Sequence, residues 1–165
     1  MGDDMKKNIF ICFICLLFCG CTTRLTKEEK QFFIYDDMKE KLVNQIQFDE
    51  TMDCQVSLVY NKLNDGYRYD IIIYQPLKDM YYINAMCYAE ESLNQMCPNI
   101  GIFDDENYHL KKDYVNKKEG FYKGIQLSGI VKMKRKIKLY ISYYTDIKRT
   151  KKIEKYIEVL ENEIR

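Results

Sequence analysis

The spacing of apolar residues along this chain predicts a helix followed by strands. Between residues 26 and 47, apolar side chains such as Tyr35 and Leu42 recur every three or four positions, as in an amphipathic helix. Thr26 and Glu29 stand three residues apart at the start of this segment, which is the spacing of a capping box. After the segment the apolar period falls to two, which predicts β-strands.

Several segments with this shorter period follow. The segments on either side of Asn64–Gly66 are predicted to form a hairpin, because Asn, Asp and Gly tolerate the positive φ of a tight turn. Pro76 ends the second of these segments. Residues 80–89 are expected to form a third strand, with a short helix as the alternative. Residues 121–133 and 137–144 are expected to form an antiparallel pair with one buried face and one face exposed to water.

The last segment, residues 149–165, returns to a helical period. Ile153, Tyr156 and Leu160 recur at three- and four-residue steps, which predicts a closing helix. The expected fold is therefore α+β: an N-terminal helix, a meander-like antiparallel β-sheet, and a C-terminal helix packed on one sheet face.

The N-terminal segment has the order of a secretory signal. Lys6 and Lys7 precede an apolar run at residues 9–18, which is shorter than the roughly 20 residues that a membrane span needs. The residues Phe18-Cys19-Gly20-Cys21 resemble a lipobox, where bacterial prolipoproteins gain a diacylglycerol on cysteine and are cut before it. We therefore expect Cys21 to carry a lipid.

This interpretation divides the chain into three parts. Residues 1–20 would be a lipoprotein signal peptide, residues 21–25 the lipidated cysteine with a tether, and residues 26–165 a single domain. The lipid would hold the protein in the cell membrane, facing the extracytoplasmic side, because two or more acyl chains bind stably. Either Met1 or Met5 could be the natural start, since two acidic residues precede the lysines.

Composition narrows the classes of partner. The chain has 26 basic and 25 acidic residues and a net charge of +1, so nothing in its bulk charge favours nucleic acid as a partner. It has 15 tyrosines and no tryptophan. Tyrosine offers a large rigid contact area at low entropic cost, so an exposed tyrosine-bearing face suits protein recognition.

Three cysteines follow the expected anchor, at Cys54, Cys87 and Cys97. An extracytoplasmic location permits disulfides. Cys87 and Cys97 are close in sequence and form a possible disulfide, with buried free thiols as the alternative.

Catalytic and metal-binding patterns are weak. His109 is the only histidine, so a Ser-His-Asp or Cys-His enzyme would have to use it, but it stands in a polar stretch where a solvated side chain is expected. Its spacing from the cysteines matches no zinc motif, and Asp104–Glu106 lacks the spacing of an EF-hand. We expect no catalytic residue, no metal and no other cofactor, and therefore no enzyme.

The candidate partner-binding residues are Tyr122, Lys138, Tyr140 and Tyr144. They alternate away from the apolar face of the two late strands, so they are expected to lie on an exposed sheet face. A solvated face without function is the alternative. If the face binds a partner, Tyr140→Ala should weaken binding by over about 1 kcal/mol and leave the fold intact.

Three short strings carry a family resemblance: PNIGIFDD at residues 98–105, GIQLSG at 124–129 and YISYYTD at 140–146. Together with the extracytoplasmic signal, they are similar to the TipC family of immunity proteins, which occur in Gram-positive bacteria with type VII secretion. The resemblance spans about residues 50–160. It implies an α+β fold with a concave binding face and a secreted antibacterial toxin as the partner that the protein neutralises.

The lipobox departs from family members that are held by a transmembrane helix. An immunity protein has no catalytic residue to carry over. Two other functions stay open: a ligand- or envelope-polymer-binding lipoprotein, which would have a pocket, and an envelope hydrolase, which would gather groups around His109 or a pair of carboxylates.

Overall fold

The computed structural model describes residues 25–161, so the expected signal peptide, Met1, Met5 and Cys21 lie outside the described residues. The chain divides into two units, residues 1–30 and 31–165. In the first unit, the described residues hold the start of helix α2 (Lys27–Asn44). Thr26 N–H donates to Glu29 Oε2 at 2.7 Å, and Glu29 N–H donates to Thr26 Oγ1 at 3.2 Å, which confirms the predicted capping box.

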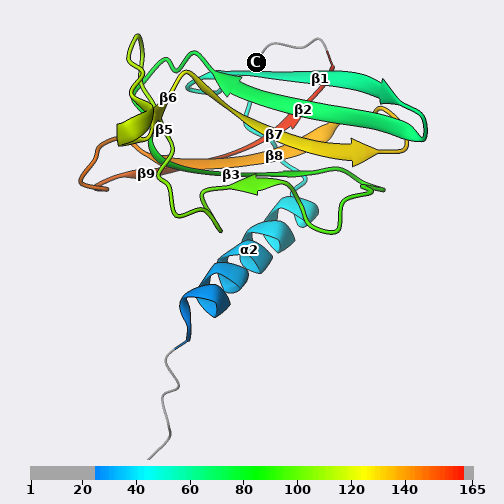
Figure 1. Cartoon of the computed structure of the whole chain (residues 1–165), viewed down its shortest axis with the longest axis horizontal. Helices are drawn as coiled ribbons and strands as arrows, with labels where there is room; N and C mark the ends of the chain where they lie inside the picture. The colour runs from blue at the N-terminus through cyan, green and yellow to red at the C-terminus, as the bar shows by residue number, and fades with distance from the viewer. Residues whose placement is uncertain (1–24, 162–165) are drawn as a thin grey trace, which may run out of the picture. The chain divides into compact units, whose positions relative to one another are not determined.

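The second unit consists mainly of strands in three sheets (Figure 1). One sheet has the order β1-β2-β7, another the order β4-β3-β8-β9, and a two-stranded sheet joins β5 and β6. Neighbouring strands are antiparallel, except for the parallel pair β5 and β6. The strand bounds are β1 (Gln55–Leu63), β2 (Gly66–Tyr74), β3 (Tyr81–Tyr88), β4 (Asn99–Ile100), β5 (His109–Leu110), β6 (Phe121–Tyr122), β7 (Gly124–Val131), β8 (Ile137–Tyr144) and β9 (Lys152–Val159).

The two larger sheets pack face to face around one apolar core. Alternate residues of each strand point inward, as expected for a β-sandwich. Core residues of the β1-β2-β7 sheet include Val56, Leu58, Tyr69, Ile71, Ile73 and Leu127, and those of the other sheet include Ala85, Cys87, Leu139, Ile141, Ile157 and Val159.

The predicted hairpin at Asn64–Gly66 is confirmed. β1 and β2 pair along their whole length, and Leu63 stands opposite Gly66. Gly66 has a φ of +150°, and a Cβ there would overlap the carbonyl oxygen of Val131. The turn therefore needs glycine for its conformation and for the close approach of β7. Residues 80–89 also form the predicted strand, as β3, in place of the alternative short helix.

The predicted pairing of residues 121–133 with 137–144 is wrong. β7 pairs with β2, and β8 pairs with β3 and β9, so these two strands belong to opposite sheets. Each strand alternates correctly, because each turns one face to the same core. A period of two cannot distinguish a hairpin from two strands in facing sheets, and the expected single meander-like sheet is therefore also wrong.

The predicted C-terminal helix is wrong as well, and with it the expected α+β class. Residues 152–159 form β9, which pairs with β8 along its length. Ile157 and Val159 point into the core, and Tyr156 points to the opposite face. The segment fits both periods, and its β-branched residues together with the free edge of β8 favour a strand.

The outer face of the β4-β3-β8-β9 sheet is covered by the C-terminal half of α2 (Figure 1). Tyr35, Met38 and Leu42 of the helix pack on Met86 and Tyr140 of the sheet. The face of residues 137–144 that was expected to meet water is therefore largely buried. Within residues 25–161 no helix has the length and apolar character that crossing a membrane would require.

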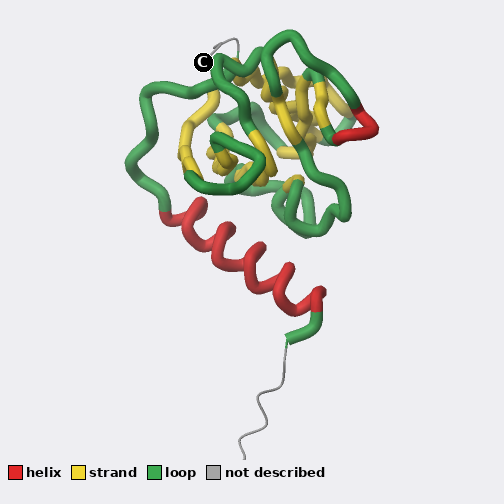
Figure 2. Tube along the Cα trace, turned by 90° about the vertical axis from the view of Figure 1, so that its left-hand side faces the viewer, coloured by secondary structure: helices red, strands yellow, loops and turns green. Residues whose placement is uncertain are grey.

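Between β3 and β7 the chain runs mostly as loops, drawn in green in Figure 2. These loops hold β4, β5, β6 and the 3₁₀ helix η1 (Lys117–Glu119). Leu110 of β5 forms an antiparallel bridge with Met80, just before the start of β3, where the candidate site lies.

Candidate binding surface

A β-bulge near the start of β3 shapes this part of the molecule. Tyr81 pairs with Tyr144 of β8, and the next pair is Asn84 with Ser142, so β3 has one extra residue here. Tyr82 lies in the bulge with a φ of +51°, a conformation that is rare for a bulky side chain. Such strain persists where the surroundings fix it, and it is concentrated at functional sites.

The imidazole of His109 contacts the bulge. The backbone N–H of Tyr82 donates to His109 Nδ1 at 2.9 Å, and the two rings meet edge to face with centroids 4.8 Å apart. The expected solvated position is wrong, because His109 begins β5 and is only 4% exposed. Burial, aided by the charge of Arg149, lowers the pKa of His109, so the imidazole stays neutral and can accept this bond.

Arg149 also contacts the bulge, through the ring of Tyr82. Its guanidinium lies 3.8 Å from the centre of the Tyr82 ring, and its own φ is +59°. The carboxylate of Asp146 shapes this loop by accepting the backbone N–H of Lys148 at 2.8 Å and the Thr150 hydroxyl. These hydrogen bonds lower the pKa of Asp146, and the bond from the Thr150 side chain has the largest effect. Tyr82 and Arg149, both with positive φ, thus meet in a cation–π contact.

A second pair of tyrosines lies beside this contact. The rings of Tyr108 and Tyr122 stack with centroids 5.3 Å apart and planes inclined by 29°. The Tyr122 hydroxyl donates to Glu106 Oε2 at 2.7 Å, and this bond to the carboxylate raises the pKa of Tyr122 to about 12. This hydrogen bond and the stacking on Tyr108 hold the Tyr122 ring in place.

We call these residues the tyrosine–arginine surface, defined as Tyr82, Tyr108, Tyr122, Tyr144 and Arg149. A hollow of about 220 Å³ lies between Tyr82, Tyr108, Tyr144 and Arg149. A second hollow of about 420 Å³ is lined by Tyr122 and η1. Glu106 and Asn107 line both hollows, so the two adjoin and form one concave area.

The structure separates the four predicted partner-binding residues. Tyr122 and Tyr144 belong to the tyrosine–arginine surface. Tyr140 lies under α2, is 3% exposed, and donates its hydroxyl to Glu154 at 3.0 Å.

Lys138 is also engaged beneath the helix. Its Nζ donates to the carbonyl oxygens of Val43 at 2.7 Å and Gln45 at 2.9 Å. These carbonyls belong to the C-terminal end of α2, where carbonyl groups lack helical partners. Lys138 therefore satisfies the helix end, and together with Tyr140 it serves the packing of α2 instead of an open face.

Cys54, Cys87 and Cys97 are free thiols, so the possible Cys87–Cys97 disulfide is not formed in the structure. Burial raises the pKa of both Cys54 and Cys87 to about 12. Burial also raises the pKa of Cys97, whose backbone N–H donates to the Tyr35 hydroxyl at 2.7 Å. All three thiols are therefore protonated at neutral pH.

Across residues 25–161, no three His, Cys, Asp or Glu side chains gather in a way that could hold a metal ion. His109 contacts three aromatic rings, those of Tyr81, Tyr82 and Phe121. Comparison with known proteins finds no matching family model, no matching curated protein and no matching solved structure.

Proposed function

We propose that this protein is a membrane-anchored, extracytoplasmic immunity protein that binds and neutralises an exported antibacterial toxin of type VII secretion. The observation that carries the proposal is the tyrosine–arginine surface. Tyrosine and arginine are the residues on which binding energy is commonly concentrated at protein interfaces. Four tyrosines and one arginine around adjoining hollows would give a toxin such a set of contacts.

The rigidity of this surface supports the proposal. Tyr82 is fixed by His109 and Arg149, and Tyr122 is fixed by Glu106. Side chains that are ordered before binding lose little entropy when the partner arrives. The strained backbone at Tyr82 and Arg149 also fits this proposal, because it brings the two side chains together at the surface that would bind the toxin.

The segment that resembles the TipC family lies at the same place. Gly101, in the string PNIGIFDD, lines the hollow of about 220 Å³. Its φ is +78°, and a Cβ there would overlap Asn84 of the bulged strand. A glycine in this string is thus required by the geometry of the proposed binding surface.

A protection assay tests this function. A sensitive Gram-positive host exports the toxin encoded beside the gene, expresses this protein with its own signal, and survivors are counted. We expect the intact protein to protect, Arg149→Ala and Tyr144→Ala to lose protection, and Phe33→Ala to keep it. Phe33 is the matched control because it is an aromatic residue of α2 that is 71% exposed.

Equal death with and without the protein would overturn the proposal for that toxin. Protection that survives both surface substitutions would remove the tyrosine–arginine surface from it. Cys21→Ala tests the anchor separately, and loss of protection at normal protein levels is expected if tethering matters.

A different surface favours the second candidate, an envelope-polymer-binding lipoprotein. On the outer face of the β1-β2-β7 sheet, Asp70 accepts hydrogen bonds from Ser128 at 2.6 Å, Gln126 at 2.8 Å and Arg68 at 3.0 Å. An ordered polar face of this kind suits a hydroxyl-rich polymer. Cosedimentation with purified cell walls tests it: binding that Asp70→Ala abolishes would support the second candidate, and no binding would count against it.

A further inference from the structure

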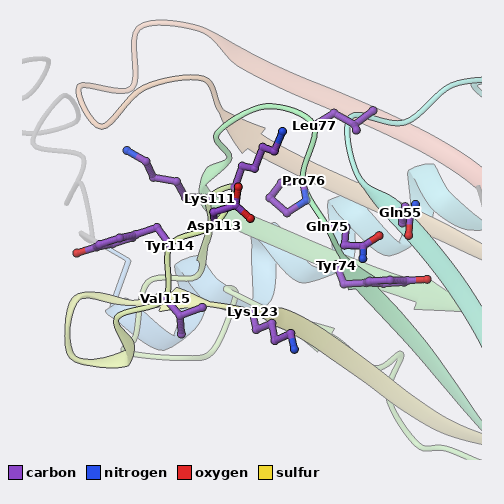
Figure 3. A pocket seen from close by; sticks show the side chains of 11 residues that line it. Gln55, Tyr74, Gln75, Pro76, Leu77, Lys111, Asp113, Tyr114, Val115 and Lys123 are labelled. Carbon is purple, nitrogen blue, oxygen red and sulfur yellow. The ribbon is translucent and has the colours of Figure 1, made fainter.

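A groove of about 530 Å³ lies where β1 begins and β2 ends. Figure 3 shows Tyr114 and Val115 on one wall and Tyr74, Gln75 and Pro76 on the other. None of the residues that line the groove belongs to the tyrosine–arginine surface. The groove is therefore a separate feature of the molecule.

Apolar side chains stand open to solvent around this groove. Leu77 is 71% exposed, Val115 is 53% exposed and Tyr114 is 39% exposed. A single exposed apolar residue needs no explanation, but a group of them around one hollow is typical of an interaction site.

The walls of the groove are fixed before any ligand arrives. Gln75 and Asp113 have φ values of +46° and +55°, so a non-glycine residue is strained on each wall. The Tyr114 ring meets Phe121 edge to face at 5.0 Å, and its hydroxyl donates to Glu119 at 3.0 Å. The groove is thus held open by its own contacts.

The rim of the groove is basic. Lys111, Lys112 and Lys123 line it with one acidic residue, Asp113, so basic side chains outnumber acidic ones by three to one. Lys111 pairs with Asp79 at 3.4 Å, whereas Lys112 and Lys123 are exposed and form no ion pair with residues 25–161. Two lysines are therefore available to carboxylates of a ligand.

We infer that this groove binds an extended, acidic segment of a partner protein that carries an apolar anchor residue. The anchor would lie against Tyr114 and Val115, and the flanking carboxylates would meet Lys112 and Lys123. A hollow favours a peptide over a lipid surface, because membrane-inserting side chains must protrude from the protein to reach the acyl region. The inference does not depend on the function of the tyrosine–arginine surface.

The test uses the full-length protein in detergent and three fluorescein-labelled peptides: Glu-Glu-Leu-Phe-Glu-Glu, its Lys-for-Glu counterpart, and Glu-Glu-Gly-Ser-Glu-Glu. Fluorescence anisotropy should show the tightest binding for the first peptide. Lys112→Glu with Lys123→Glu should weaken that binding about tenfold, since two ion pairs are replaced by repulsion. The matched control, Lys62→Glu with Lys132→Glu, changes two exposed lysines outside the groove and should leave binding within about twofold.

Equal binding of the acidic and basic peptides, or no effect of the Lys112 and Lys123 changes, would overturn the inference. Soluble dihexanoyl-phosphatidylglycerol is the second probe, read by the melting temperature. A rise in melting temperature that needs Lys112 and Lys123, without binding of the acidic peptide, would also overturn it and assign the groove to lipid headgroups. None of these readouts involves the toxin, so they can fail independently of the protection assay.

Discussion

The substitution Tyr140→Ala tests whether the outer face of β8 is open to solvent or covered by α2. From the alternation of the strand alone, we would expect Tyr140→Ala to leave the fold intact. From the structure we expect it to destabilise the fold, because the ring lies between β8 and the helix with 3% of its surface exposed. It contacts the Tyr156 ring with centroids 5.0 Å apart, and its hydroxyl donates to Glu154 at 3.0 Å.

The expected cost follows from what each substitution removes. Tyr140→Ala deletes a buried aromatic ring and leaves a cavity between helix and sheet, which costs about 3–5 kcal/mol of unfolding free energy. Tyr140→Phe deletes only the hydroxyl and its hydrogen bond, which costs about 0.5–1.5 kcal/mol. A domain is commonly stable by only about 5–15 kcal/mol, so the alanine variant should lose a large share of its stability.

Urea unfolding followed by far-UV circular dichroism measures these differences; this signal suits a chain without tryptophan. Tyr122→Ala is the matched control, because Tyr122 is a half-buried tyrosine whose stacking on Tyr108 contributes about 1 kcal/mol. A loss of less than about 1 kcal/mol for Tyr140→Ala would show that α2 does not cover this face. Tyr140 would then return as a candidate contact with the partner.

Three further substitutions test other parts of the structure. Gly129→Ala should lower the unfolding free energy by about 1–3 kcal/mol, because its Cβ would overlap the buried Tyr69 ring; urea unfolding measures the loss. Lys138→Met should cost about 1–2 kcal/mol, because the carbonyls at the end of α2 lose their donor; the same titration tests it, and no loss would argue against this cap. His109 has a lowered pKa, so its contribution to stability is present above about pH 6.5 and is lost as pH falls through its folded pKa. His109→Gln should therefore flatten the fall in stability between pH 7.5 and 5, and an unchanged slope would refute this role.

The elements that could be predicted are those fixed by neighbouring residues. Thr26 and Glu29 cap their helix across three positions, and the hairpin needs only the residues of the turn Asn64–Gly66. The C-terminal segment could not be assigned in this way. Ile153 and Ile157 are four residues apart, which fits one turn of a helix and also two alternations of a strand. The segment forms a strand because it pairs with the edge of β8.

The pairing of the strands could not be predicted from the sequence for a related reason. Residues 124–131 and 137–144 are separated by a short connection that suits a hairpin, yet the chain crosses between the sheets there. Tyr60 contributes to holding this crossing, since its hydroxyl donates to the carbonyl oxygen of Arg135 at 2.6 Å. That contact joins residues far apart in the chain, so no local pattern signals it.

The candidate site follows the same division. The sequence pattern selected Tyr122 and Tyr144 as outward-facing residues, but Tyr122 lies in the separate strand β6 and packs partly against the core. Lys138 and Tyr140 satisfy the same alternation and lie beneath α2. A period of two gives the face of a strand, and it does not show which part of that face another element covers.

Tyr82 and Arg149 could not be selected by any pattern, because each departs from what its neighbours favour. A tyrosine within a strand should be extended, and an arginine gains nothing locally from a positive φ. The two unusual backbone conformations are stabilised only where β3, β5 and the loop after β8 meet. There His109 accepts a hydrogen bond from the backbone N–H of Tyr82, and the Arg149 guanidinium lies over the Tyr82 ring. Conflicts between local preference and final structure are concentrated where function requires a particular arrangement. The strain at Tyr82 and Arg149 is therefore the physical reason to test this surface, ahead of the more regular sheet faces, as the site that meets a partner.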